Sequence, residues 1–399
     1  MDGAPTHRAA ARREDAGLRG AYALLGLVMS AFIPFLTLLL RDRGLSPDEI
    51  GLVLAVLSVS GVAVAPFWSH TADTRLGTVH TMQLACAAAS VFALGLIVTG
   101  SNLVAVAAVC VLLGAAQSPQ TALTDALVLS RLGPERMDEY GTFRLWQSVG
   151  WGVGCIAIGA LLTTAGVDLA LPIYAGGVAV YAVYVARFGR SRPEARPPTA
   201  SRLGSVGEAF RTVEHLPMFL LGTLVFATST HAAGDFVPLR IVSGGGDALL
   251  VGVAAGVSAF VEIPFMRSSR SLVERLGLRG MFAVGAGVYA AASLAWAAFP
   301  DPVAVTAVRI AIGVGFALTY VSLVQMTAHL VPERLRNTGQ TLLQISTWGL
   351  GPMIGDAVGG LVYEHLGPPQ LFLGSAAGIA VGIAMVWVSA GTRDRAGRV

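Results

Sequence analysis

The chain has 399 residues and a net charge of +3; 54% of its residues are apolar and only 13% are charged. The charged share is about half that of a soluble protein (roughly 25%), and all 27 basic residues are arginine. This composition cannot supply the polar surface that a soluble protein of this length needs. It therefore excludes the soluble class and predicts a chain whose surroundings are lipid.

Long apolar runs recur along the chain, each about as long as a membrane-crossing helix (about 20 residues). Residues 1–18 are polar, and the apolar run after them is too long for the core of a signal peptide, so we take it as the first span. The runs are continuous rather than alternating, which favours helices over a barrel. The prediction is an all-α polytopic membrane protein with 12 transmembrane helices in two homologous six-helix bundles. The expected spans are 20–40, 48–69, 79–99, 103–127, 143–163, 170–187, 216–239, 249–267, 280–299, 303–328, 341–363 and 370–390.

One segment of the first half returns in the second. Residues 134–154 read PERMDEYGTFRLWQSVGWGVG, and residues 332–351 read PERLRNTGQTLLQISTWGLG. Six identical pairs coincide at an offset of 198 residues, and with a one-residue slip Trp151 also falls on Trp348. In both copies a short charged loop leads into a long apolar helix, but only the first copy places an arginine, Arg144, inside that helix. A duplicated apolar architecture of this kind is typical of transporters.

The segment 188–215 is rich in Arg, Pro and Ser and divides the spans six and six. We therefore expect an N-terminal bundle over residues 1–187, a cytoplasmic linker over 188–215 and a C-terminal bundle over 216–399. Cytoplasmic loops are enriched in basic residues, so the arginines predict the orientation. With the N-terminus inside, 23 arginines fall on the inner side and three on the outer side: Arg41, Arg43 and Arg240. We expect both termini to be cytoplasmic and the chain to lie in the inner (cytoplasmic) membrane.

No pattern of a catalytic or cofactor-binding site is visible in the sequence. A pump driven by nucleotide hydrolysis needs a GxxxxGK[ST] loop, which the sequence lacks. Cys86, Cys110 and Cys155 are scattered within apolar spans, so we interpret them as packing residues rather than a disulfide or metal site. We expect no enzymatic activity, no cofactor, no metal and no nucleic-acid partner, and a monomer in the lipid bilayer.

Two tight turns on the inner side resemble each other. Each has an acid, an arginine and then a glycine: Asp73, Arg75 and Gly77 after the second span, and Glu274, Arg275 and Gly277 after the eighth. An acid at a helix end can accept hydrogen bonds from free amides and pair with an arginine across the bundle interface. We expect these turns to act as a conformational latch that holds one state closed. An ordinary charged cytoplasmic turn is the alternative.

Twelve spans in two halves, with acid–arginine–glycine turns after spans two and eight, resemble the major facilitator superfamily. Two motifs are similar to the branch that holds the phenylpropionate permease, the lactose permease and the nucleoside–proton symporters: Pro119-x-x-x-Leu123-Thr124-Asp125-Ala126-Leu127 and Tyr140-Gly141-x-x-Arg144-Leu145-Trp146-x-Ser148. The resemblance implies the major facilitator fold. The sequence departs from it in two places. Ser69 stands where the superfamily usually shows glycine, and the glycine–proline signature of drug antiporters is missing from the fifth span, although GPxxG occurs at 351–355 in the eleventh.

Polar residues inside the spans are costly in lipid unless they face a cavity or a partner, which makes them candidate functional residues. Asp125 in the fourth span and Arg144 in the fifth could meet as an ion pair on adjacent antiparallel helices. The resemblance to the lactose permease implies that Arg144, Trp151 and, less directly, Asp125 bind the substrate, with the Trp151 indole stacked on it. A static ion pair near the interface is the alternative. Tyr320 and Gln325 in the tenth span are further substrate-binding candidates.

Glu262 lies well inside the eighth span, where a charged carboxylate loses its hydration, so it is the main candidate to bind and release a coupling proton. Asp125 is a second candidate for this role. His231 and Asp235 share one face of the seventh span by their i, i+4 spacing and could extend a proton path or cap the helix end. Asp356 lies among glycines of the eleventh span that favour close helix packing, and it completes the set of proton-coupling candidates.

The sequence thus predicts a secondary active transporter that moves a small organic solute by alternating access, as a proton-coupled uptake symporter. Two alternatives stay open: proton-coupled efflux of a hydrophobic or natural-product compound, and a membrane sensor that does not transport. Sugars, nucleosides and aromatic acids all suit one arginine, an acid and several aromatic residues, so the substrate class also stays open.

Overall fold

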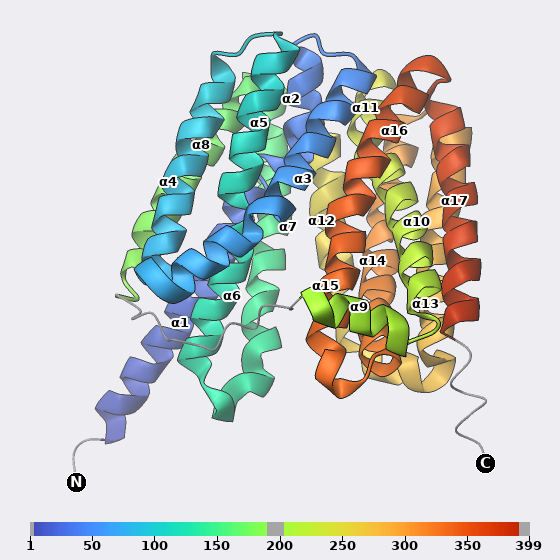
Figure 1. The fold of residues 1–399 in the computed structure, drawn as a ribbon. Helices are drawn as coiled ribbons and strands as arrows, with labels where there is room; N and C mark the ends of the chain where they lie inside the picture. Colours follow the sequence, from blue (N-terminus) through green and yellow to red (C-terminus); the bar gives the residue numbers. More distant parts are fainter. Residues whose placement is uncertain (1–3, 190–202, 391–399) are drawn as a thin grey trace, which may run out of the picture.

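The protein is described by a computed structural model that covers residues 4–189 and 203–390, and within these ranges every regular element is helical. Long helices run between two ends of the molecule (Figure 1). The helix that begins at residue 4 and the helix that ends at residue 389 start and finish at the same end, which we call the terminal side. The opposite end is called the far side.

The helices of the first half lie together in Figure 1, coloured blue to green. They are α1 (Ala4–Met29), η1 (Ile33–Phe35), α2 (Leu36–Asp42), α3 (Pro47–Thr71), η2 (Ala72–Leu76), α4 (Gly77–Ile97), α5 (Leu103–Gln117), α6 (Pro119–Leu132), η3 (Pro134–Glu139), α7 (Tyr140–Ala165), η4 (Val167–Leu169) and α8 (Ala170–Ala186).

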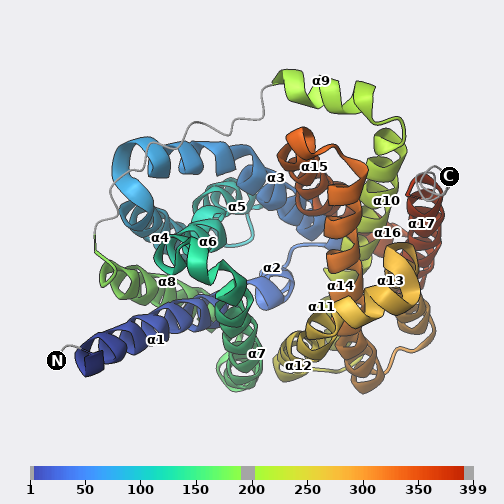
Figure 2. The ribbon, with the colours of Figure 1, turned by 90° about the horizontal axis from the view of Figure 1, so that it is seen from below.

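The helices of the second half form the other group, coloured light green to red (Figures 1 and 2). They are α9 (Leu203–Thr212), α10 (Leu216–Gly234), α11 (Val237–Ser243), α12 (Ala248–Arg267), α13 (Ser269–Ala298), α14 (Pro302–Leu330), η5 (Glu333–Leu335), α15 (Arg336–Gln344), η6 (Ile345–Leu350), α16 (Gly351–His365) and α17 (Pro368–Ser389).

Ten stretches of the described chain are long and apolar enough to cross a membrane. One of them, 47–97, has 51 residues, and a straight helix of that length would measure about 75 Å, more than twice the thickness of a bilayer core. It folds back at Gly77, whose φ of +73° is a conformation that favours glycine. The stretch 336–365 is divided by the wide π-helical turn η6 and is not among the ten. Because 47–97 contains two spans and 336–365 adds one more, the ten stretches correspond to the twelve predicted spans.

Four expected spans are interrupted where the sequence suggested continuous helices. The fourth span breaks at Ser118 between α5 and α6, and Pro119 begins α6. The first span breaks between α1 and η1, and the seventh breaks between α10 and α11; Pro34 and Pro238 stand at the start of the short helices that follow. Proline lacks an amide hydrogen and is tolerated in the first turn of a helix, so these breaks have a local cause. The eleventh span is divided by η6, whose composition carries no comparable signal.

The predicted linker 188–215 is described only in part, because residues 190–202 lie outside the described ranges. Residues 203–212 form α9, which packs against α10 and α15 at the terminal side and lies at the edge of the molecule in Figure 2. Glu208 of α9 pairs with Arg334, and Thr338 Oγ1 donates to Ser205 Oγ at 3.1 Å. This part of the linker is therefore attached to the second half.

The two halves meet mainly along two pairs of helices, α7 with α12 and α3 with α16. Glycines allow close contact near the far side: a methyl group on Gly252 would lie 2.2 Å from the Cys155 carbonyl oxygen, and one on Gly51 would lie 2.3 Å from the Asp356 carbonyl oxygen. Small residues let helix backbones approach in this way in membranes.

The apolar core shows that the far side is closed. Buried residues of the far-side part of the second half, such as Phe236 and Val251, belong to one continuous core with the first half. Buried residues of its terminal-side part, such as Phe219 and Phe282, form a separate cluster. The ribbons of the two groups also diverge toward the terminal side in Figure 1. The halves are therefore packed together at the far side and separate toward the terminal side.

Candidate functional site

The predicted pair of Asp125 and Arg144 is present where the two halves face each other. Asp125 lies on α6, and Arg144 lies one turn into α7, which begins directly after the charged loop of the repeat. Arg144 Nε is 3.7 Å from Asp125 Oδ1, and the Tyr22 hydroxyl of α1 donates to the same oxygen at 2.6 Å. The Arg144 guanidinium also lies over the Tyr22 ring, 5.7 Å from its centroid. Both charged side chains stay partly exposed, with 28% and 37% of their surface accessible.

Glu262 of α12 approaches this pair from the second half. The Ser148 hydroxyl of α7 donates to Glu262 Oε1 at 3.0 Å, so this hydrogen bond crosses the interface. Arg144 and Ser148 share one face of α7 by their i, i+4 spacing. Arg144 and Arg309 both lie within electrostatic range of the Glu262 carboxylate. We call Asp125, Arg144, Ser148 and Glu262 the polar site.

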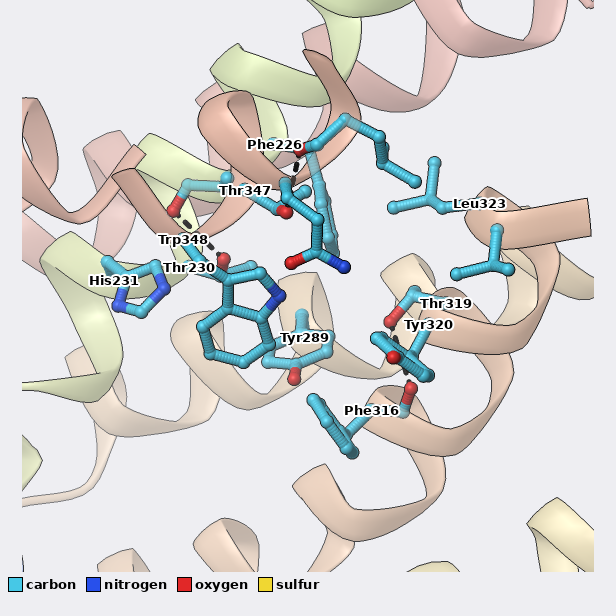
Figure 3. A pocket seen from close by; sticks show the side chains of 14 residues that line it. Phe226, Thr230, His231, Tyr289, Phe316, Thr319, Tyr320, Leu323, Thr347 and Trp348 are labelled. Carbon is cyan, nitrogen blue, oxygen red and sulfur yellow. Dashed lines mark hydrogen bonds between the residues drawn. The ribbon is translucent and has the colours of Figure 1, made fainter. Parts of the chain in front are cut away.

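A pocket of about 80 Å³ opens in the second half beside the polar site. Its walls come from α10, α13, α14, α15 and η6, and Figure 3 shows the rings of Trp348, Tyr289, Phe316 and Tyr320 around it. Phe316 and Tyr320 stack with centroids 5.6 Å apart, and Trp348 meets Phe316 edge to face at 6.3 Å. Tyr289 lies within electrostatic range of both Glu262 and Arg309, which places the pocket next to the polar site. We call it the aromatic pocket.

The structure separates the remaining substrate-binding candidates. Tyr320 lines the aromatic pocket, whereas Gln325 and Trp151 are not among the residues that line it. Trp151 packs on the first half, where its backbone nitrogen would lie 2.7 Å from a methyl group on Gly26 of α1. Substrate contact by Tyr320, Trp151 and Gln325 stays a prediction.

His231, Asp235 and Asp356 form a third polar group, which we call the acidic cluster. His231 Nδ1 and Asp235 Oδ2 are 2.9 Å apart, which agrees with their predicted shared face. One ligand-type atom from each of the three residues lies within 4.8 Å of the others, close enough for the group to hold a cation. Asp356 is 2% exposed, and its Oδ1 has no hydrogen-bond partner among the described residues. The ring of His231 also lines the aromatic pocket, 5.9 Å from the Trp348 ring (Figure 3).

The two predicted latch turns have the same backbone geometry. Gly77 and Gly277 have φ values of +73° and +67°, so each turn needs a glycine at that position. Asp73 and Arg75 are exposed and make no ion pair among the described residues, and Glu274 pairs only with Arg270 of its own helix at 3.2 Å. Within the described residues no ion pair across the halves therefore involves Asp73, Arg75 or Glu274, and the latch stays a prediction.

Comparison with known proteins identifies the family. The model of the MFS_1 like family matches residues 17–374, nearly the whole chain. The chain belongs to this family of major facilitator transporters. It is 28% identical over 371 residues to the maltose permease of Geobacillus stearothermophilus, a match that covers 88% of this chain and 89% of that protein. It is 23% identical over 368 residues to an uncharacterized transporter, YwbF, of Bacillus subtilis (strain 168), covering 90% and 89%.

Solved structures confirm the major facilitator fold. The nucleoside transporter NupG superposes with a TM-score of 0.80 at 16% identity, covering 93% of this chain and 98% of that chain. An auto-inhibited peptide transporter of the POT family gives a TM-score of 0.75 at 12% identity, covering 97% and 98%. The protein is thus a multi-pass membrane transporter that carries a small solute, and its relatives are transporters rather than enzymes.

Sequence reasoning missed several residues that surround the sites of this transporter. Tyr22 and Ser148 hydrogen-bond the carboxylates of the polar site, and Phe316 and Tyr289 line the aromatic pocket. Trp348 was visible only as the repeat partner of Trp151. A hydroxyl or an aromatic ring is common in membrane helices for packing reasons, so its position in a span carries little signal by itself.

The GPxxG pattern in the eleventh span of the transporter has a packing role. A methyl group on Gly351 would lie 2.6 Å from the Ala227 side chain, and one on Gly355 would lie 2.4 Å from the Thr228 carbonyl oxygen, both on α10. These glycines let α10 and the eleventh span approach closely. The pattern therefore gives no separate support to drug efflux.

Proposed function

We propose that this transporter is a proton-coupled symporter that takes up a small hydroxylated solute, with its terminal side in the cytoplasm. The observation that carries the proposal is the polar site, in which an ion pair of the first half faces a carboxylate of the second half. A solute that contacts both halves at once can couple its own binding to their relative movement, which is the requirement of alternating access.

The chemistry of the two adjacent sites favours a ring that bears hydroxyl groups. The guanidinium of Arg144 offers a planar set of donors, and the carboxylates of Asp125 and Glu262 accept hydrogen bonds from hydroxyls. The aromatic pocket offers ring faces for stacking beside these groups. The maltose permease and the nucleoside transporter NupG, to which the chain is similar, are named for solutes that carry hydroxylated rings. A sugar or a nucleoside is therefore the proposed substrate class.

Glu262 is the proposed proton-binding residue for coupling. Its carboxylate accepts a hydrogen bond from Ser148 across the interface, so separation of the halves at this point breaks that bond. A charged carboxylate in a low-dielectric site is costly without partners, and water that enters when the site opens lowers this cost. Proton binding and release at Glu262 would thus follow the state of the transporter, which gives the coupling its direction.

The latch turns fit the same cycle. In the present state the halves separate toward the terminal side, and among the described residues Asp73, Arg75 and Glu274 make no ion pair across them. We propose that these turns engage when the terminal side closes, where an acid can cap free helix amides.

Transport by purified protein in proteoliposomes tests the proposal. A ligand-stabilisation screen of sugars, nucleosides and aromatic acids selects the solute, and an imposed pH gradient, acidic outside, should then drive its accumulation. Expulsion of the solute under the same gradient would support efflux, and the lack of saturable exchange with every solute would favour the non-transporting sensor.

The aromatic pocket gives a matched pair of variants for the same assay. Trp348→Ala should weaken solute binding roughly threefold to tenfold, because an aromatic stacking contact contributes about 0.5–1.5 kcal/mol. Trp387→Ala removes a partly exposed indole on α17, outside the pocket lining, and should leave binding unchanged. An equal loss of solute affinity in both variants would show that the aromatic pocket does not bind the solute.

A further inference from the structure

We propose that Asp235 and Asp356 share one proton and that this proton holds the far side closed. The proposal rests on the proposed proton coupling and adds a second protonation site to it, separate from Glu262. It assigns the acidic cluster the role of a sensor for the gate between the halves at the far side.

The side chains of Asp235 and Asp356 lie so close together that a positive charge between them would stabilise both. The two carboxylates and the His231 ring have ligand-type atoms within 4.8 Å of one another. Asp235 already has a partner, because its Oδ2 is 2.9 Å from His231 Nδ1. Asp356 is 2% exposed, and its Oδ1 has no hydrogen-bond partner among the described residues. A buried unpaired carboxylate is costly, and a proton shared with the neighbouring carboxylate removes that cost.

The other charged groups near the pair do not neutralise Asp356. Arg309 of α14 lies within electrostatic range of Asp235, where it attracts that carboxylate. Asp48 and Glu49 of α3 lie at the far side, where their carboxylates accept hydrogen bonds from Ser46. The segments η6 and α17, which also pack on α10 or α16, contain no ionisable residue. Tyr289 of α13 lines the aromatic pocket but makes no hydrogen bond to the pair among the described residues.

The same two aspartates belong to the closed far-side interface through their backbones. Thr37 Oγ1 of α2 donates to the Asp235 carbonyl oxygen at 3.1 Å, one of three side-chain hydrogen bonds that cross the halves within the described residues. The Asp356 carbonyl oxygen is the atom against which Gly51 of α3 packs. Asp235 also stands at the break between α10 and α11, where the helix is interrupted. Interrupted helices are typical places for ion sites in transporters.

A change of charge in the pair therefore acts directly on the gate. With one proton present, α10 and α16 can stay in the contact that aligns Asp235 with Thr37 and Asp356 with Gly51. Without it, two carboxylates within 4.8 Å repel each other in a medium of low dielectric constant and push these helices apart. Opening of the gate admits water to the two carboxylates. The side chain of Asp235 is half-buried, so the proton can exchange with water through it. In a symporter, proton uptake by the pair then favours closure after loading.

Distances across the far side test this inference on the full-length transporter in lipid nanodiscs, without solute and with a chelator present. Spin labels on Asp42→Cys of α2 and Glu364→Cys of α16 report the gate, because both positions are exposed and the three native cysteines are buried. In the otherwise native protein, raising the pH from acidic to alkaline values should lower the ratio of closed to open populations by about tenfold, within the usual range of coupling between sites.

Neutral variants give the decisive comparison. Asp356→Asn and, independently, Asp235→Asn remove the repulsion, so both should stay closed over the whole pH range. Asp301→Asn, which changes a helix cap at the far side of α14 and lies outside the acidic cluster, should keep the native pH response. Size-exclusion chromatography shows which variants are folded, and either cluster variant is sufficient for the test.

Several outcomes would overturn the inference. These are a native gate that does not respond to pH, cluster variants that respond like the native protein, loss of the response in Asp301→Asn, or closure that requires added Zn²⁺. Accumulation of the solute in proteoliposomes is measured on the same preparations. If solute accumulates under a proton gradient but the gate does not respond to pH, only this inference is wrong. If solute does not accumulate, the proposed function is wrong, and the gate measurement still tests this inference.

Discussion

Arg136 and Arg334 occupy equivalent positions in the two copies of the repeat, and each pairs with an acid on the first described helix of its own half. Arg136 contacts Asp15 of α1 through two nitrogen–oxygen pairs at 2.9 and 3.1 Å, and Arg334 pairs with Glu208 of α9. The duplicated PER loop thus has one structural role in both halves. It ties the helix that leads into each half to the turn before its fifth span.

The first prediction concerns Arg136 and pH. Arg136 also donates to Glu139 at 2.8 and 3.0 Å, and this hydrogen bond holds the pKa of Glu139 below its ordinary value. A lowered pKa stabilises the fold above the ordinary value of about 4.3, and the contribution is lost as the pH falls through the lowered value. Arg136→Gln should therefore lower the Tm by a few degrees at neutral pH, because exposed ion pairs contribute little.

The difference between Arg136→Gln and the native protein should shrink on acidification below about pH 4. Thermal unfolding followed at several pH values measures it. Arg334→Gln provides the matched variant in the second half, where a single exposed pair to Glu208 is lost and the effect should be smaller. A Tm difference that does not change with pH would show that the Glu139 pair is not its source.

The second prediction concerns Arg144. Lysine cannot reproduce the planar donor set that the guanidinium presents to a carboxylate or to two hydroxyls. Arg144→Lys should lower the rate of uptake by at least about tenfold, equivalent to about 1.4 kcal/mol, with little change in the amount of protein in the membrane. Arg211→Lys, on the exposed helix α9, is the control and should transport normally. Native uptake by Arg144→Lys would assign the Asp125 pair a structural role.

The third prediction concerns Glu262. Glutamine keeps the shape of the side chain and fixes a neutral state, so Glu262→Gln should bind solute and exchange it across the membrane in counterflow. It should fail to concentrate solute against a gradient, because no proton can leave. Glu364→Gln, at an exposed position of α16, serves as the control. If Glu262→Gln accumulates solute fully, the coupling residue is among Asp125, Asp235 and Asp356.

The fourth prediction concerns the glycine contacts of the far side. A side chain at Gly252 meets the Cys155 backbone across the interface, so Gly252→Val should prevent closure while each half still folds. Transport should be lost, and the spin-label distance between positions 42 and 364 should lengthen. Gly287→Val, on α13 where nothing lies within 4 Å of an added methyl group, should keep both properties. A normal distance in Gly252→Val would show that this contact does not control the gate.

The fifth prediction concerns orientation. Because 23 arginines lie in the segments predicted to be cytoplasmic, reporter fusions after Arg192 and Arg393 should give a cytoplasmic signal. A fusion at Gly245, in the loop between α11 and α12, should give an external signal. A cytoplasmic signal at Gly245 would reverse the orientation and, with it, the direction proposed for transport.

The spans, the internal repeat and the expected orientation could be read from the sequence because they depend on local properties. A helix in lipid satisfies its own backbone hydrogen bonds, so apolar length is sufficient to locate it. The contact between His231 and Asp235 also follows from spacing on one helix. The meeting of Asp125 with Arg144 follows from two spans that are adjacent in the chain.

Contacts between distant segments were decided only by the tertiary structure. The aromatic pocket combines Tyr289, Phe316 and Trp348 from three different spans, and an aromatic ring suits lipid, core and pocket equally well in a sequence. Asp356 was recognisable as a polar residue in an apolar span, but its proximity to Asp235 depends on how closely glycines let the seventh and eleventh spans approach. The closed far side has the same origin: it results from packing between the two halves, and side-chain patterns along one helix do not specify which partner, or which end, is in contact.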